Sequence, residues 1–217
     1  MPDLLGGRDQ QAGGTWLALH RNGRFATVTN FRDAVPPSGK LRSRGHLVTD
    51  FLQSERSVSD YLGEIDADAY AGFNLLVADG TELAYLSNRD GGFRLLPPGI
   101  YGVANATLDS PWAKVERSKA GLSALIESGR ANETNLLRLL DDRNKASVSE
   151  VEAGRLDFEK AHAMTAPFIV QADYGTRCST VLLRDNKDKV RFTEMRFAAD
   201  GSSTGRSDFT FGVIAWI

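Results

Sequence analysis

The chain carries its strand-like patterns in two blocks, with a block of helical patterns between them. Apolar and β-branched runs bounded by turn residues occur before residue 105 and again after residue 167. Helical apolar spacing dominates between residues 110 and 140. A wound parallel sheet would instead alternate single strands with single helices along the whole chain. The order of patterns therefore predicts an α+β fold with antiparallel sheets.

The first block opens on a hairpin. Thr15–His20 and Arg24–Asn30 flank Arg21-Asn22-Gly23, and Asn-Gly supplies the positive backbone angles that a tight turn requires. Asp79-Gly80 and Asp90-Gly91-Gly92 separate later runs in the same way. We predict further strands at Phe73–Ala78, Glu82–Ser87, Phe93–Leu96 and Ile100–Ala104.

Helices are predicted from apolar spacing and end signals. One apolar stripe contains Leu47, Val48, Phe51 and Leu52, and Ser57 is a suitable N-cap for a second helix that reaches Ile65. A longer helix is predicted to open at Ser110-Pro111, with proline in the first turn. It is followed by another over Asn132–Leu140.

The second block predicts a second antiparallel sheet. Its strands are expected at Phe168–Gln171, Ser179–Arg184, Val190–Phe197 and Phe209–Trp216. Lys145–Met164 is polar and poorly patterned, so we predict a variable insert there. Leu75–Val77 and Val181–Leu183 are apolar at successive positions, as strands covered on both faces are. Two stacked sheets with helices outside satisfy this pattern.

Composition narrows the class of protein. The 217 residues suit one large domain, or two small ones at most, and we predict a single domain over residues 1–217. With 28 acidic against 26 basic residues, the chain has no electrostatic footprint for nucleic acid. The sequence has no apolar run of membrane-spanning length, so no stable membrane insertion is expected. One cysteine excludes an internal disulfide and is typical of a reducing compartment, which predicts a cytoplasmic protein.

Polar side chains recur where the predicted strands end. They are Asn30, Arg32, Asn74, Asn88, Asn105 and Arg177. Amides both donate and accept hydrogen bonds, and a guanidinium forms a fixed fork for carboxylates. Gathered at one rim, these side chains would form a site for an anion or a carbonyl group. The alternative is that the asparagines only shape turns and the arginines are only solvated.

Histidine and cysteine point to no metal site or cofactor. His20, His46 and His162 lack the spacing of metal ligands, and His20 is expected at an exposed hairpin tip. Cys178 follows Arg177, which could lower the pKa of its thiol. The alternative is that Cys178 is a small buried residue.

Seven motifs resemble, in order, those of the NRDE family, also called the transport and Golgi organisation family. They are Ala12–Leu17, Thr29–Arg32, Gly72–Leu76, Tyr85–Arg89, Gly99–Gly102 with Asn105, Pro111-Trp112 with Lys114, and Tyr174–Arg177 with Ser179-Thr180. The family is similar to N-terminal-nucleophile amidases and acylases. The resemblance implies a four-layer α-β-β-α sandwich of two antiparallel sheets.

The resemblance also implies roles for the rim. Asn74 and Asn105 would position or stabilise an oxyanion, and Arg177 would support the nucleophile. Asn30, Arg32 and Asn88 would lie on the substrate side. The family begins with Met-Cys and a strand leading to Asn-Arg-Asp-Glu, whereas this sequence begins Met1-Pro2. We therefore expect this chain to lack the first strand region, through a misplaced start codon or a true truncation.

Three functions remain open at this point. The first is an amidase or acylase acting on a non-peptide amide, whose nucleophile lies upstream of this sequence. The second is a non-catalytic protein that binds or carries a small molecule, such as an acyl, lipid or haem carboxylate. The third is a truncated product that folds poorly. The sequence does not disclose the oligomeric state.

Overall fold

The computed structural model describes residues 3–32, 41–151 and 157–213. It divides into two compact units, Met1–Ser110 and Pro111–Gly212, which are described separately. Each contains one antiparallel sheet and helices, so the predicted α+β class with two antiparallel sheets is confirmed. The prediction that residues 1–217 form a single domain stays a prediction.

The first unit is built on a six-stranded antiparallel sheet in which every strand pairs with its neighbours in the sequence. Its strands are β1 (Leu4–Gly6), β2 (Leu17–His20), β3 (Phe25–Asn30), β4 (Phe73–Ala78), β5 (Leu83–Ser87) and β6 (Gly92–Leu95). The short connections between neighbours explain why turn signals alone located most of this sheet. The sequence analysis did not predict strand β1, which pairs Leu5 with Leu19.

The predicted Asn-Gly turn is confirmed between β2 and β3. Gly23 adopts φ 89° and its N–H donates to the His20 carbonyl at 2.9 Å. Asn22 Oδ1 accepts from Arg24 N at 3.0 Å, and His20 Nδ1 accepts from Asn22 N at 3.1 Å. His20 is therefore a buried turn residue, 9% exposed, and the prediction that it is exposed was wrong.

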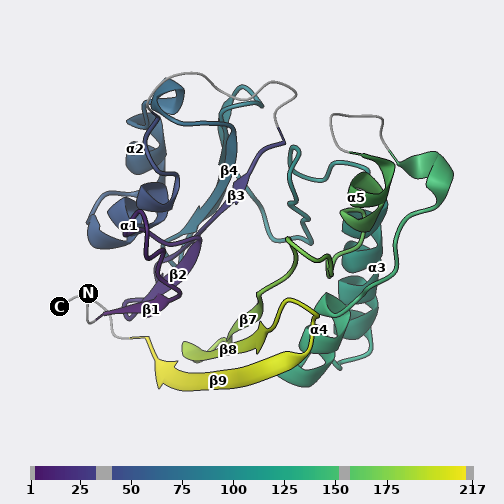
Figure 1. Cartoon of the computed structure of the whole chain (residues 1–217). Coiled ribbons are helices and arrows are strands. Elements are labelled where there is room, and N and C mark those ends of the chain that lie inside the picture. Colours follow the sequence, from purple (N-terminus) through teal and green to yellow (C-terminus); the bar gives the residue numbers. More distant parts are fainter. Residues whose placement is uncertain (1–2, 33–40, 152–156, 214–217) are drawn as a thin grey trace. The chain divides into compact units, whose positions relative to one another are not determined.

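Helices α1 (Gly45–Gln53) and α2 (Val58–Gly63) cover one face of the first sheet (Figure 1). A one-turn helix η1 (Ala67–Ala69) follows them. Both helices match the predicted apolar stripes, and Ser57 caps α2 by accepting from Asp60 N. The main core lies under them, with Phe51, Phe73 and Leu75 fully buried. Apolar burial of this size is the dominant favourable term in folding.

Two predicted strands are irregular instead. Ile100–Ala104 contains no strand, because the segment folds back on itself: Asp109 Oδ1 accepts from Gly102 N at 2.8 Å. Asp109 N also donates to the Gly102 carbonyl, and its φ of 57° tightens the loop. Phe168–Gln171 forms only an isolated bridge from Val170 to Gly175. Short apolar runs do not distinguish a strand from a packed loop.

The second unit carries α3 (Ala113–Glu127), α4 (Glu133–Leu140) and α5 (Phe158–Ala163), with one-turn helix η2 (Val148–Glu150). Helix α3 begins after Trp112, not at the predicted Ser110-Pro111. Asn132 caps α4, close to the predicted start. The predicted insert 145–164 contains α5 and bonds back to the unit through Thr165 Oγ1, which accepts from Ala146 N. Its variability stays a prediction.

The sheet of the second unit has three strands, β7 (Cys178–Arg184), β8 (Lys189–Phe197) and β9 (Ser203–Gly212). Strand β9 begins well before the predicted Phe209, and the end predicted at Trp216 lies outside the described residues. Helix α4 packs on this sheet, and Arg191 Nε pairs with Glu133 Oε1 at 3.1 Å.

Each sheet has a second face opposite its helix-covered face. By strand alternation and pairing, Leu17, Leu76 and Tyr85 share this face of the first sheet. On the second sheet it carries Leu182, Phe192 and Phe209. Phe192 is 2% exposed and Phe209 is 45% exposed. Both second faces are therefore rich in apolar side chains.

A buried arginine joins the first hairpin to the end of α1. Arg24 is 8% exposed, and its Nη2 donates to the Arg56 carbonyl at 2.9 Å and the Phe51 carbonyl at 3.4 Å. Its guanidinium lies 4.0 Å from the centre of the Phe51 ring. Burial lowers the pKa of Arg24, which nevertheless remains protonated at neutral pH. A cation at the carboxyl end of a helix is also favoured by the helix dipole.

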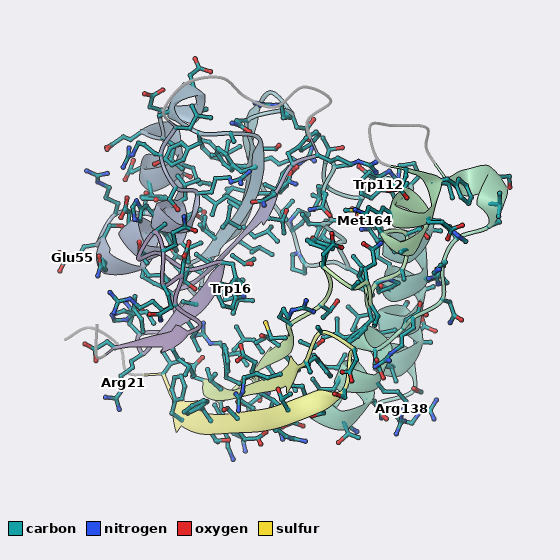
Figure 2. The ribbon with its side chains drawn as sticks, in the orientation of Figure 1. Trp16, Arg21, Glu55, Trp112, Arg138 and Met164 are labelled. Atoms are coloured by element: carbon teal, nitrogen blue, oxygen red, sulfur yellow. The ribbon has the colours of Figure 1, made fainter. Side chains whose placement is uncertain are left out.

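Replacing Arg24 with methionine should destabilise the protein by about 1–3 kcal/mol, because carbonyls at the end of α1 lose a charged donor. Urea unfolding measures the change. Arg21→Met is the matched control, since Arg21 is exposed and points away from the unit in Figure 2. Equal unfolding midpoints for the two variants would show that Arg24 does not hold this helix end.

Candidate functional site

Asn74 lies in β4, opposite Thr29 of β3 and Ser87 of β5. It is 1% exposed. Its Nδ2 donates to the Ala106 carbonyl at 2.9 Å, to Thr29 Oγ1 at 3.2 Å and, more weakly, to the Ala104 carbonyl at 3.4 Å. An amide nitrogen has two hydrogens, so both are already engaged. Asn74 therefore holds segment 104–106 against the sheet.

Tyr85 completes this buried network. Its hydroxyl donates to Asn74 Oδ1 at 2.7 Å and accepts from Leu108 N at 3.1 Å, and the residue is 1% exposed. Burial is the main cause of its raised pKa, which keeps the hydroxyl protonated as a donor. The sequence analysis missed the role of Tyr85. Tyr85 was named only as the first residue of the motif Tyr85–Arg89, without a role; it lies on the same sheet face as Asn74, two residue pairs along the strands.

Segment 104–106 in turn brings three predicted residues together. Asn105 Nδ2 donates to the Asn30 carbonyl at 2.9 Å, and Arg32 N donates to the Asn105 carbonyl at 2.7 Å. Within the described part of the chain, the Arg32 guanidinium has no hydrogen-bond or ion-pair partner. We call Asn30, Arg32 and Asn105 the rim. Among the described residues it offers an unpaired cation beside the partly engaged side-chain amide of Asn105.

The side-chain amide of Asn88 is fully used in hydrogen bonds to the backbone. Its Oδ1 accepts from Phe73 N at 2.9 Å, and its Nδ2 donates to the Ala67 carbonyl at 3.1 Å and to those of Tyr70 and Ala71 at 3.3 Å. The side chain thus joins the end of β5 to the turn that precedes β4. No amide hydrogen is left for a ligand.

Arg177 lies in the second unit, directly before β7. Its backbone carbonyl accepts from Phe197 N at 2.9 Å. A Cβ on Gly175 would lie 3.2 Å from Arg177 Nη1 and 2.6 Å from the Ile169 carbonyl oxygen, so this close approach requires glycine. The Arg177 guanidinium, like that of Arg32, has no bonding partner among residues the structure describes. That Arg177 and the rim belong to one site stays a prediction.

Cys178 is not an activated nucleophile. It is half-buried, and burial, followed by the nearby Glu194 carboxylate, raises the pKa of its thiol. This is the opposite of the predicted effect of Arg177. The reactive form of cysteine is the thiolate, so both causes disfavour reaction at this position.

The histidine side chains bind backbone groups. His46 Nε2 bonds the Ala12 carbonyl and His162 Nε2 bonds the Ala146 carbonyl, each at 2.9 Å. In the described ranges, no three of the His, Cys, Asp and Glu side chains gather as metal ligands would. None of the helices in these ranges is long and apolar enough to cross a membrane.

The fold and the rim define an α+β protein in which the Arg32 guanidinium, at one end of the six-stranded sheet, has no bonding partner among the described residues. A family model described as "Transport and Golgi organisation 2" matches residues 1–199. The chain belongs to this family, as the resemblance of its motifs predicted.

Several relatives carry the family name. The Transport and Golgi organization protein 2 homolog of Bos taurus is 36% identical over 215 residues, which cover 88% of this chain and 76% of that protein. The Homo sapiens homolog is 32% identical over 213 residues with the same coverage. The Drosophila melanogaster protein is 25% identical over 219 residues, covering 88% of this chain and 74% of that protein.

Changing Tyr85 to phenylalanine should cost about 2 kcal/mol or more, because buried Asn74 Oδ1 loses its donor and Leu108 N its acceptor. Hydrogen exchange should accelerate across residues 102–109, measured by mass spectrometry alongside urea unfolding. Tyr101→Phe is the control, since the Tyr101 hydroxyl bonds the Pro97 carbonyl at an exposed site. A loss no larger than that of the control would contradict the role given to Tyr85.

Proposed function

We propose that this chain binds a small amphiphilic carboxylate, such as a fatty acid, and does not hydrolyse an amide through the residues named above. The observation that carries the proposal is a contrast between two side chains. Asn74 has four hydrogen-bonding partners, whereas the Arg32 guanidinium has none in the described residues. The rim thus offers a cation, whereas the buried amide of Asn74, outside the rim, already has all its hydrogen bonds.

Amide hydrolysis is the weaker candidate for a physical reason. An oxyanion donor must point at a vacant position where negative charge develops in the transition state. Asn74 could do so only by abandoning buried carbonyl and hydroxyl oxygens, at a cost of about 1–3 kcal/mol for each unpaired group. Asn105 directs its amide hydrogen at the Asn30 carbonyl. We retain an N-terminal-nucleophile amidase or acylase as the proposed origin of the fold.

A carboxylate is the ligand group that suits the free cations best. A guanidinium is planar and binds both oxygens of a carboxylate, and its charge persists at every physiological pH. The ligands this favours are acyl, lipid or haem carboxylates. The relatives are named for transport and Golgi organisation, which fits a binding or carrier role better than catalysis. We place the protein in the cytoplasm, because a single cysteine is typical of a reducing compartment.

We further propose that the two sheets stack as the middle layers of a four-layer α-β-β-α sandwich in one domain. Two supports are the apolar second faces of the sheets and the helices on their other faces. Stacked sheets lie about 10 Å apart, which brings facing methyl groups into contact.

Methyl NMR tests the stacking without any substitution. Selectively labelled leucines should give nuclear Overhauser cross-peaks between Leu17 or Leu76 of the first sheet and Leu182 of the second. If assigned spectra connect these leucines only to their own sheets, the sandwich is wrong.

Arg32→Ala should weaken binding of dansyl-labelled undecanoic acid by about tenfold or more, because a charge-assisted hydrogen bond is lost. Fluorescence titration of the full chain measures the dissociation constant. Arg177→Ala should weaken binding similarly if Arg177 contributes to the same site. The matched controls are Arg21→Ala and Arg138→Ala, two exposed arginines on the outer surfaces of their units in Figure 2.

Equal affinity in Arg32→Ala and the wild-type chain would contradict the proposal. So would retention of affinity by the probe's methyl ester, which lacks the negative charge. Release of a free amine from an N-acyl amide by the unmodified chain would favour the hydrolase instead.

A further inference from the structure

A cavity of about 310 Å³ lies in the first unit among β1, the loop of residues 7–14, β2 and α1. Leu4 and Gly6 line it from β1, Ala18 from β2 and Thr49 from α1. Neither the rim nor Asn74 contributes to it. Its volume is at the small end of the range for ligand sites in proteins.

Glycines form much of the cavity wall. Four of its nine lining residues are glycines, so nearly half of the wall carries no side chain. A Cβ on Gly6 would lie 2.3 Å from the Leu17 carbonyl oxygen, and one on Gly14 would lie 2.5 Å from the Gly45 carbonyl carbon. Larger residues at these two positions would collide with backbone. Glycine is therefore required where β1 meets β2 and where the loop meets the start of α1.

Arg8 is the one charged residue in the cavity lining. In the described part of the chain, its guanidinium has no hydrogen-bond or ion-pair partner. The neighbouring Asp9 does not line the cavity, and its Oδ1 accepts from the backbone N–H groups of Gln11 and Ala12. The cavity wall therefore carries a net positive charge, which selects an anionic group.

Toward a ligand, the two lining hydroxyls can act only as acceptors, because each already donates its hydrogen to a backbone carbonyl. Thr49 is 6% exposed, and its Oγ1 donates to the His46 carbonyl at 3.2 Å. Thr15 is 5% exposed, and its Oγ1 donates to the Leu17 carbonyl at 3.0 Å. A hydroxyl has one hydrogen and two lone pairs. Thr15 Oγ1 already accepts from Leu17 N, so Thr49 Oγ1 is the better free acceptor.

We propose that this cavity is a binding site for a short hydroxycarboxylate. The carboxylate pairs with the Arg8 guanidinium, and the ligand's hydroxyl donates to Thr49 Oγ1. The carbon chain between them packs against the apolar side chains of Leu4 and Ala18. This site goes beyond the proposed function, which rests on Arg32 and Arg177. Failure of either proposal therefore leaves the other standing.

Isothermal titration of the full chain with β-hydroxybutyrate, butyrate and butanediol tests the site. We expect β-hydroxybutyrate to bind several-fold more tightly than butyrate, and butanediol not to bind. Arg8→Gln should weaken both carboxylates by about tenfold or more. Thr49→Val should lower the affinity for β-hydroxybutyrate to that for butyrate, which should itself be unchanged. Arg21→Gln is the matched control and should bind both normally.

Three results would overturn the proposal. They are no binding of β-hydroxybutyrate at millimolar concentrations, unchanged binding in Arg8→Gln, and a preference for the hydroxylated ligand that persists in Thr49→Val. Thermal unfolding of each variant establishes that it is folded before titration. Thr49→Val also removes the hydrogen bond from Thr49 Oγ1 to the His46 carbonyl, so a change in selectivity without a change in stability isolates the role of the hydroxyl toward the ligand.

Discussion

The side-chain amide of Asn74 is the interaction on which the geometry of the candidate site depends. It is buried in the sheet and bonds β3 through Thr29, β5 through Tyr85, and segment 104–106 through two carbonyls. Buried polar groups hold their partners firmly, because leaving any of them unpaired is costly. Asn105 sits between those two carbonyls and bonds the end of β3, where Arg32 follows. A buried amide thus positions a half-buried cation.

Much of the fold could be predicted because its signals are local. The Asn22-Gly23 turn, the cap at Ser57 and the apolar stripe through Phe51 depend only on neighbouring residues, and each was found in place. The errors occurred where contacts between residues far apart in the sequence determine the local structure. Segment 100–104 is held by Asp109 and by the sheet, and β1 exists because β2 offers it an edge. His20 is buried because its ring accepts a bond across the turn.

The same contrast between local signals and contacts among distant residues applies to the candidate site. Sequence patterns identified the residues that gather around segment 104–106, including Asn30, Arg32, Asn74 and Asn105. They could not reveal that the hydrogens of Asn74 and Asn88 are engaged, because this depends on backbone carbonyls from other segments. Nor could they reveal the role of Tyr85, because its hydroxyl meets Asn74 Oδ1 only in the folded chain. Residue identity predicted a candidate site, whereas the hydrogen bonds in the structure assign structural roles to Asn74 and Asn88.

The central claim is that Asn74 is structural and that Arg32 meets the ligand. NMR of specifically labelled side chains tests both statements in one titration with dansyl-labelled undecanoic acid. The account predicts that the Nε–Hε signal of Arg32 shifts with ligand concentration. It also predicts that the side-chain amide signals of Asn74 stay in place and exchange slowly with solvent. A shift of the Asn74 amide signals with Arg32 unmoved would contradict it.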